Sequence, residues 1–308
     1  MVDGGTLVDV IVAQFGGAHR PVHADGIGVL GSFTATADAA TLSRAPHLSG
    51  PPVPVTARFS DSSGVPGADE RRGDVRGFAV RFHLPGGVET DMVAMTLPTF
   101  FVRTPADFLA FSRVNVPDPA TGVVDRDAVE GYLAEHPEAM AAFAALGELQ
   151  GAVDASYAGC TFHGVHAFGW VSEAGQTTWI RFRWQTVETI APWSLADASA
   201  LSPDHLRREL AARMRDGRGA RFDLVAQLAA GGDDLSDPTV AWPADRREVV
   251  AGHLVLGALV GDQYAECEGL AYDPTRLVDG VVCSADPILA ARGQAYPTSA
   301  ARRRAAYS

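Results

Sequence analysis

Apolar residues at the start of the chain recur at the spacing of an α-helix. They stand at Leu7, Val10, Ile11 and Phe15. Residues three or four positions apart share one side of a helix, so a short N-terminal helix is predicted here. Two glycines follow at positions 16 and 17, and glycine favours the end of a helix.

After residue 26 the pattern changes to short runs rich in Val, Phe and Met, separated by Gly, Pro and Asp. Such runs are typical of β-strands, and the clearest cover residues 53–60, 77–84 and 88–96. Further strands are expected at residues 160–172, 177–186 and 253–260. Strands joined by irregular connections, with helices added at intervals, predict an α+β fold around an antiparallel sheet.

Helices are expected between and after these strands. A helix should begin at Thr104, because the next residue is Pro105 and proline is favoured in the first turn of a helix. The alanine-rich residues 128–148 are predicted to be helical with an interruption near His136-Pro137. Residues 203–230, where apolar residues recur every four positions, are also predicted to be helical. The final helix is expected over about 286–304, with Asp286 as its N-cap and a proline in its first turn.

Composition and charge exclude several classes of protein. Hydrophobic residues make up 47% of the 308 and charged residues 20%, as in well-buried globules. A net charge of −12 argues against nucleic acid as a partner, because phosphates would be repelled. The three cysteines are far apart, which argues against disulfides or a zinc site. Neither a secretory signal nor an apolar run of the ~20 residues that span a bilayer is visible, so we expect no membrane contact and a cytoplasmic location.

The candidate chemistry begins near the end of the chain. Arg292 stands one helical turn before Tyr296, so both side chains share one face of the final predicted helix. The guanidinium can stabilise the phenol as a phenolate, which is a strong anionic ligand. Tyrosine as the axial ligand of haem iron is the arrangement of catalases. Because such a pair is also common as a surface contact, its meaning depends on the rest of the sequence.

A second stretch, residues 20–28 with the sequence Arg-Pro-Val-His-Ala-Asp-Gly-Ile-Gly, resembles the segment that carries the distal histidine of haem catalases. The resemblance continues in the family's order along almost the whole chain. Further matches stand at residues 57–60 (Ala-Arg-Phe-Ser), 74–82 (Asp-Val-Arg-Gly-Phe-Ala-Val-Arg-Phe), 98–105 (Pro-Thr-Phe-Phe-Val-Arg-Thr-Pro), 166–168 (His-Ala-Phe), 242–243 (Trp-Pro), 265–266 (Ala-Glu), 273–274 (Asp-Pro) and 292–296 (Arg-Gly-Gln-Ala-Tyr). Each motif alone is weak, but their common order is specific.

The resemblance implies the fold of a catalase, an antiparallel β-barrel with flanking helices that binds haem. It implies a single domain over residues 1–308, with the proximal iron ligand on the helix over about 286–304. The long terminal extensions of full-size catalases have no match here, so the chain looks like the catalase core alone. Full-size catalases assemble through such extensions, so we expect a smaller assembly such as a homodimer.

Carried over position by position, the motifs imply roles for individual residues. His23 would be the distal base that moves a proton during peroxide cleavage, which suits histidine because its pKa lies near neutral, and Ser60 would orient it. Tyr296 would bind the iron of haem b, with Arg292 as its partner. The other residues implied at the haem are Arg20, Arg58 and Arg303 at the propionates, Val22 beside the distal base, Phe108 against the ring and His166 near its edge. For Arg303 a basic C-terminal tail is an equal alternative, and no nicotinamide site can be matched, so haem alone is predicted.

One departure from the family pattern concerns Met95. Large catalases carry a distal asparagine in a Val-Gly-Asn-Asn-Thr-Pro stretch, whereas residues 93–98 read Val-Ala-Met-Thr-Leu-Pro here. In large catalases the amide of this asparagine helps to position the second peroxide of the catalase cycle. A thioether cannot donate the hydrogen bond that the amide donates. Loss of a positioning donor typically costs about 10²–10³ in rate, so Met95 predicts weak oxygen release.

Together these features predict a haem-dependent peroxidase that reduces hydrogen peroxide or organic hydroperoxides, oxidises small organic donors and has weak catalase activity. Three alternatives remain. A true catalase would release oxygen quickly despite Met95. Family members that rearrange fatty hydroperoxides carry Thr-His at the distal position, whereas this chain has Val22-His23. A haem carrier or sensor would need Tyr296 and the arginines but no distal base, so the presence of His23 and Ser60 argues against it.

Overall fold

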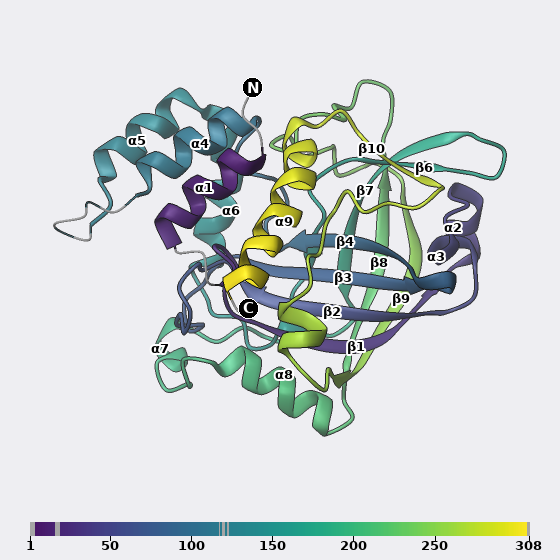
Figure 1. The fold of residues 1–308 in the computed structure, drawn as a ribbon, viewed down its shortest axis with the longest axis horizontal. Helices are drawn as coiled ribbons and strands as arrows, with labels where there is room; N and C mark the ends of the chain where they lie inside the picture. Colours follow the sequence, from purple (N-terminus) through teal and green to yellow (C-terminus); the bar gives the residue numbers. More distant parts are fainter. Residues whose placement is uncertain (1–3, 16–18, 117, 119–120, 122, 307–308) are drawn as a thin grey trace.

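The computed structural model of the chain describes residues 4–15, 19–116, 118, 121 and 123–306. Within them, ten strands form one antiparallel sheet, eight of which close into a barrel (Figure 1). In the order of pairing around the barrel, these are β1 (Gly26–Ala35), β2 (Val53–Asp61), β3 (Arg76–Leu84), β4 (Val88–Met95), β5 (Phe162–His163), β7 (Thr177–Thr186), β8 (Ala220–Leu228) and β9 (Glu248–Leu259). Two short strands, β6 (Phe168–Val171) and β10 (Val281–Cys283), extend the sheet beyond β7. The predicted α+β fold with an antiparallel barrel is confirmed.

Large aromatic side chains fill the interior of the barrel. Those at most 1% exposed include Phe33, Phe59, Phe78, Phe82, Phe162, Trp184 and Phe222. Phe59 on β2 and Phe78 on β3 are register partners, and their rings stack with centroids 4.3 Å apart. A barrel of eight strands is just wide enough for side chains to fill, so its interior is a packed core. Any sizeable ligand site must therefore lie outside it.

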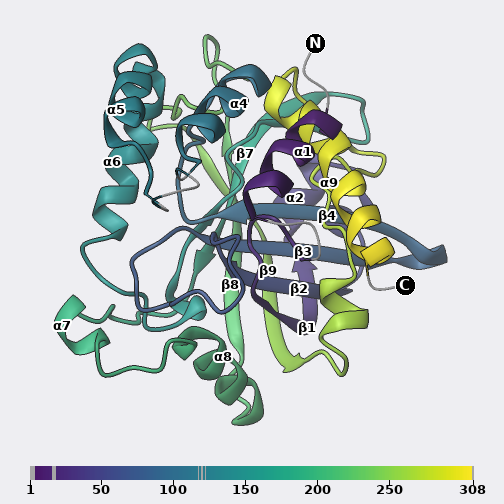
Figure 2. The same cartoon turned by 60° about the vertical axis from the view of Figure 1, so that its left-hand side comes forward.

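Most of the longer helices gather on one side of the barrel (Figures 1 and 2). They are α1 (Gly4–Phe15), α4 (Pro105–Val114), α5 (Arg126–Glu135), α6 (Met140–Leu149) and α9 (Pro287–Ala306). The N-terminal helix α1 packs along the C-terminal helix α9, as both views show. The helices placed elsewhere are α2 (Ala37–Leu42), α3 (Pro46–Ser49), α7 (Leu195–Ala198) and α8 (His205–Arg215). Among the residues described, no helix combines the length and the apolar character that a membrane crossing needs.

Short 3-10 turns and one π-helix complete the chain. The turns are η1 (Pro85–Gly87), η2 (Pro137–Ala139) and η3 (Tyr157–Gly159), and the π-helix is η4 (Tyr264–Glu268). The predicted helix starts are confirmed at two caps. Thr104 accepts a hydrogen bond from the backbone N–H of Asp107, whose carboxylate in turn accepts from the N–H of Thr104. Asp286 accepts hydrogen bonds from two backbone N–H groups in the first turn of α9, at 2.8 and 3.2 Å.

Three of the predicted elements need correction. The strand expected over residues 160–172 is two short strands, β5 and β6, and residues 164–167 between them lie outside the sheet. Residues 203–230 are not helical throughout: α8 ends at Arg215, and β8 follows as a strand. Gly217 and Gly219 between them have φ of 72° and 64°, values that glycine adopts readily and that end a helix. The strand predicted to begin at residue 253 begins at Glu248. In addition, α2 and α3 lie between β1 and β2, in a region where only strands were expected.

Candidate active site

A cavity of about 460 Å³ lies between the barrel wall and the helices α1, α4, α6 and α9. Its lining divides into two groups of side chains. The arginines Arg20, Arg58 and Arg303 lie together in one part of the wall. Another part is made of aromatic rings in mutual contact, namely Phe100, Phe101, Phe108, Phe111 and Phe143. The cavity therefore suits a ligand that is apolar over most of its surface and anionic at one edge.

His23 stands in the cavity wall in an unusual backbone conformation. Its φ is 57°, the one positive value among the non-glycine residues described, and strained backbone of this kind is concentrated at functional sites. The ring Nδ1 lies 3.0 Å from the hydroxyl of Ser60 at the end of β2. Desolvation by the surrounding protein, with the positive charge of Arg58 in addition, lowers the pKa of His23 to about 3. The imidazole is therefore neutral at pH 7, and its pKa of about 3 lies well below the near-neutral value on which the sequence-based expectation rested.

Gly77 lies directly against this pair and was not predicted as a site residue. A Cβ atom at Gly77 would stand 2.8 Å from Nδ1 of His23 and 2.8 Å from Oγ of Ser60. Atoms do not pack so closely, so the position of the ring requires glycine on β3. Gly77 lies in the matched motif over residues 74–82. The motif by itself did not indicate what the glycine does.

Tyr296 and Arg292 lie together on α9, as the spacing predicted. Nη2 of Arg292 donates a hydrogen bond of 2.6 Å to the phenol oxygen. Nη1 of the same guanidinium lies 2.8 Å from Nε2 of His166. Nδ1 of His166 in turn lies 2.6 Å from a carboxylate oxygen of Asp286, and both of these side chains are 1% exposed. Burial lowers the pKa of His166, which favours the neutral ring. The chain of contacts ends at the buried carboxylate of Asp286, which orients this ring.

His166 is therefore a partner of Arg292 in this structure. It lies in the connection between β5 and β6, and β5 ends at His163. The two histidines do not share a strand, because the chain leaves the sheet between them. His163 lines the cavity, while His166 is buried behind Arg292.

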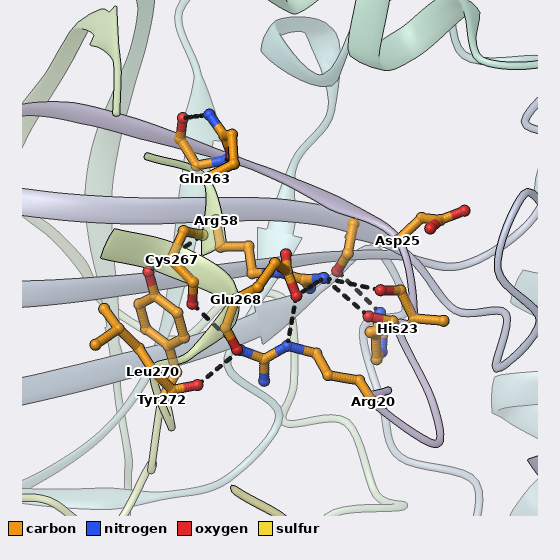
Figure 3. A network of polar contacts seen from close by, with 12 residues as sticks. Arg20, His23, Asp25, Arg58, Gln263, Cys267, Glu268, Leu270 and Tyr272 are labelled. Atoms are coloured by element: carbon orange, nitrogen blue, oxygen red, sulfur yellow. Dashed lines mark hydrogen bonds and ion pairs between the residues drawn. The ribbon is translucent and has the colours of Figure 1, made fainter. Parts of the chain in front are cut away.

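An acidic residue that sequence reasoning missed pairs with these arginines, although it does not itself line the cavity. Glu268 binds Arg20 at 3.1 Å and Arg58 at 2.6 Å, as Figure 3 shows. The carbonyl oxygen of Leu270 accepts hydrogen bonds from Arg20 and Arg303, at 2.7 and 3.3 Å. The only hint in the sequence is that Glu268 follows the matched Ala-Glu motif by two residues.

Arg303 reaches the cavity because α9 continues through Pro297. Its side chain is 7% exposed, and its Nε finds no hydrogen-bond partner among the described residues. Desolvation, with the positive charge of Arg20 in addition, lowers the pKa of Arg303 to about 9. An unpaired donor on a buried cation is costly, so this part of the cavity is chemically prepared for an anion.

The other predicted site residues also line the cavity. Met95 is the last residue of β4 and pairs in register with Gly77, next to the distal histidine. Val22 belongs to the wall although it is 40% exposed. Phe108 contributes its ring from α4. The structure thus brings every predicted site residue to the cavity wall except His166, which contacts it through Arg292.

Comparison with known proteins agrees with this architecture. The family model for catalase matches residues 18–307. A catalase-related peroxidase of Synechococcus elongatus is 35% identical over 288 residues, which cover 92% of this chain and 83% of that protein. A catalase-related peroxidase of Mycolicibacterium paratuberculosis is 36% identical over 282 residues, which cover 91% and 87%. A solved bacterial catalase superposes with a TM-score of 0.83 at 26% identity, covering 92% of this chain and 57% of that one. The resemblance seen in the motifs is confirmed, and the chain belongs to the catalase family.

Proposed function

We propose that the chain is a haem-dependent peroxidase that reduces hydrogen peroxide or organic hydroperoxides while it oxidises small organic donors, with weak catalase activity. One observation carries the proposal. A neutral histidine held by a serine, His23 with Ser60, lines the same cavity as the paired Arg292 and Tyr296. The similarity to proteins named catalase-related peroxidase supports the same activity.

The residues of the cavity fit haem b, the cofactor that the family implies. Haem is apolar over its macrocycle and carries two carboxylates at one edge, and the cavity offers aromatic rings in one part and arginines in another. The unpaired Nε of the buried Arg303 supports a propionate as its partner. Arg20 and Arg58 are the other proposed propionate contacts, and Tyr296 would bind the iron. When bound, haem would supply the iron at which a peroxide coordinates and its O–O bond breaks.

His23 would move the proton that this cleavage requires. The proposed step needs the neutral tautomer whose hydrogen is on Nδ1, which would donate to the Ser60 hydroxyl 3.0 Å away and leave Nε2 as the acceptor. Nε2 can take the proton from one peroxide oxygen and return it to the departing oxygen. Ser60 would fix the direction of the ring, while the left-handed backbone of His23 sets its position.

Arg292 would support Tyr296 as a ligand through a charged hydrogen bond. A hydrogen bond from a guanidinium favours a phenolate over a phenol, and the distance of 2.6 Å is that of a strong contact. His166 and Asp286 fix the other end of the guanidinium. The plane of Arg292 is therefore held from both sides.

The proposal is tested first by His23→Ala. Haem content should be unchanged, while stopped-flow absorbance should show peroxide cleavage slowed at least ~10²-fold, the low end for a positioned acid–base group. Ser60→Ala, which keeps the ring but removes its partner, should give a smaller loss. Cleavage at the wild-type rate in His23→Ala would remove His23 from the mechanism. Oxygen release as fast as that of a full-size catalase would instead make the protein a true catalase.

A further inference from the structure

The π-helix η4 ends at Glu268, which pairs with two arginines of the cavity wall without lining the cavity itself. Gln263, just before η4, is bound to β1 at both ends of its amide: its oxygen accepts from the N–H of Gly28 at 2.6 Å, and its nitrogen donates to the Gly28 carbonyl at 3.0 Å. Cys267 packs against the same glycine so closely that a Cβ there would lie 2.6 Å from its own Cβ. π-Helical turns are often found at functional sites, and this one is fixed to the barrel next to the distal segment.

Glu268 makes its strongest contact with Arg58. Oε1 accepts from Nε of Arg58 at 2.6 Å, and Oε2 accepts from Nη2 at 3.1 Å, so the pair is bidentate. The Arg58 side chain is 4% exposed and that of Glu268 is 26% exposed. A partly buried, bidentate ion pair restricts the guanidinium to one orientation.

The same guanidinium holds the backbone of the distal histidine. Nη2 of Arg58 also donates to the carbonyl oxygen of His23 at 3.0 Å and to that of Ala24 at 3.4 Å. Its plane lies against Gly26, where a Cβ would be 2.3 Å from Cζ of Arg58. Figure 3 shows the guanidinium between Glu268 and the His23 segment.

This contact falls where the chain is strained. A non-glycine residue with φ of 57° persists only when its surroundings hold it. Nη2 of Arg20, the other partner of Glu268, donates to the carbonyls of Cys267, Glu268 and Leu270. Arg20 precedes His23 by three residues, but the side chain that Glu268 holds and that reaches the carbonyl oxygen of His23 is Arg58.

We propose that Glu268 is a positioning residue for His23, which it holds in its left-handed conformation through Arg58. The proposal rests on the proposed function only for what His23 does, since the chain of contacts itself is independent of any cofactor. Arg58 thereby gains a second task beside the propionate contact, and Glu268 affects catalysis without touching the peroxide.

The first test is amide hydrogen exchange in the haem-free protein, read at His23 and Ala24. Their N–H groups donate to the carbonyls of Ser62 and Ser63, at 3.3 and 2.8 Å, so they report whether this segment is held. Glu268→Gln keeps the shape of the side chain but removes its charge, and it should speed exchange at both amides about tenfold, a coupling typical of residues in contact. Arg58→Gln should do the same.

The double variant decides whether Glu268 acts through Arg58. If it does, Glu268→Gln adds no further acceleration in the Arg58→Gln protein, whereas independent roles would multiply the two effects. Glu248→Gln is the matched control, because Glu248 also binds an arginine, Arg183 at 2.5 Å, but on an exposed part of the barrel. It should leave exchange at His23 and Ala24 unchanged. Unchanged exchange in Glu268→Gln, or multiplied effects in the double variant, would overturn the proposal.

A second readout uses the haem-loaded protein at matched haem content. Peroxide cleavage should slow about tenfold in Glu268→Gln and stay unchanged in Glu248→Gln. Glu268→Asp keeps the charge on a shorter side chain, so it should fall between wild type and Glu268→Gln in both readouts, and it serves alone if Glu268→Gln does not fold. Wild-type protein that cleaves no peroxide would contradict the proposed function, whereas the exchange result decides the role of Glu268 by itself.

Discussion

At the scale of single residues, the distal site depends on how little room surrounds the imidazole. Gly77 leaves space for the His23 ring where any other residue would place a Cβ 2.8 Å from it. The His23 backbone is strained at the same time, with φ of 57°. Position and strain are therefore set by neighbours that do no chemistry themselves.

Gly77→Ala should displace the His23 ring and separate it from Ser60. Because the added methyl group overpacks the site, we expect a loss of about 1–3 kcal/mol in unfolding free energy, together with slower peroxide cleavage. Denaturant unfolding and stopped-flow absorbance measure the two effects. Gly147→Ala is the control: Gly147 lies in α6, where an added methyl group would meet no atom within 4 Å, so this variant should be neutral or stabilising. An equal result for both variants would show that Gly77 is not required.

We propose that Met95 sets the balance between the peroxidase and catalase reactions. It lies in the distal wall, paired in register with Gly77, and its thioether cannot donate a hydrogen bond. Met95→Asn should therefore raise oxygen release relative to donor oxidation, measured with an oxygen electrode at equal haem content. Met95→Leu, which restores no donor, should leave the ratio low. If Met95→Leu raised the ratio as much as Met95→Asn, size rather than hydrogen bonding would be the cause.

The sequence predicted much of this site and missed what depends on distant contacts. The motifs brought out His23, Ser60 and Tyr296, and the structure places all three at one cavity. Glu268 could not be predicted, because it meets Arg58 across 210 positions of sequence. Such a pair is created by the fold: Arg58 lies in a matched motif, but nothing local to it predicts Glu268 as its partner.

At the scale of elements, α9 contributes several of the polar side chains that line the cavity. A single helix presents Arg292, Tyr296 and Arg303 to it, at separations of one and about two turns. Pro297 lies inside the helix without ending it. The helix is also fixed at its start, where Asp286 caps it and contacts His166. One carboxylate thus couples the direction of α9 to the orientation of Arg292.

Arg292→Leu should weaken haem binding through Tyr296. Removing a charged donor from a hydrogen bond typically costs about 1.5–3 kcal/mol, which corresponds to a loss of about 10- to 100-fold in affinity. A haem titration followed by absorbance measures it. Arg292→Lys keeps the charge but cannot reach Tyr296 and His166 together, so an intermediate loss is expected. Affinity unchanged in Arg292→Leu would show that the guanidinium does not support the ligand.

Elements with a clear local signal were predicted well, and β8 was not. Its buried residues alternate with more exposed ones from Ala220 to Leu224, but it follows α8 after only four residues. The periodic apolar stripe of α8 made the whole stretch look helical. The strand is formed by its pairing with β7 and β9, a tertiary contact that local propensity does not contain.

At the scale of the whole molecule, elements from the two ends of the sequence pack against each other. β1 pairs with β9, and α1 packs on α9, where Gly4 donates to the side chain of Gln294 at 2.9 Å. Closing the barrel needs strands from both ends of the chain. We therefore propose that the chain is one domain over residues 1–308 that folds as a unit.

Buried neutral histidines should make this unit sensitive to acid. His47 is 2% exposed, and its Nδ1 finds no hydrogen-bond partner among the described residues. Desolvation lowers the pKa of His47 to about 3 from 6.5. Between these values the unfolded chain binds a proton that the folded chain does not, so stability is lost as the pH falls from 6.5 toward 3. Each such histidine contributes a slope of about 1.4 kcal/mol per pH unit.

His47→Leu should remove one such slope. Denaturant unfolding at several pH values between about 6 and 4 should show the free energy of unfolding falling less steeply in the variant, by about 1.4 kcal/mol per pH unit. Asp61, whose pKa burial raises to about 6, acts in the opposite sense in both proteins, so the difference between their slopes isolates His47. Leucine also removes the unpaired Nδ1, and the variant should be at least as stable as wild type near pH ~5. Parallel curves would mean that His47 is protonated equally in the folded and unfolded chains.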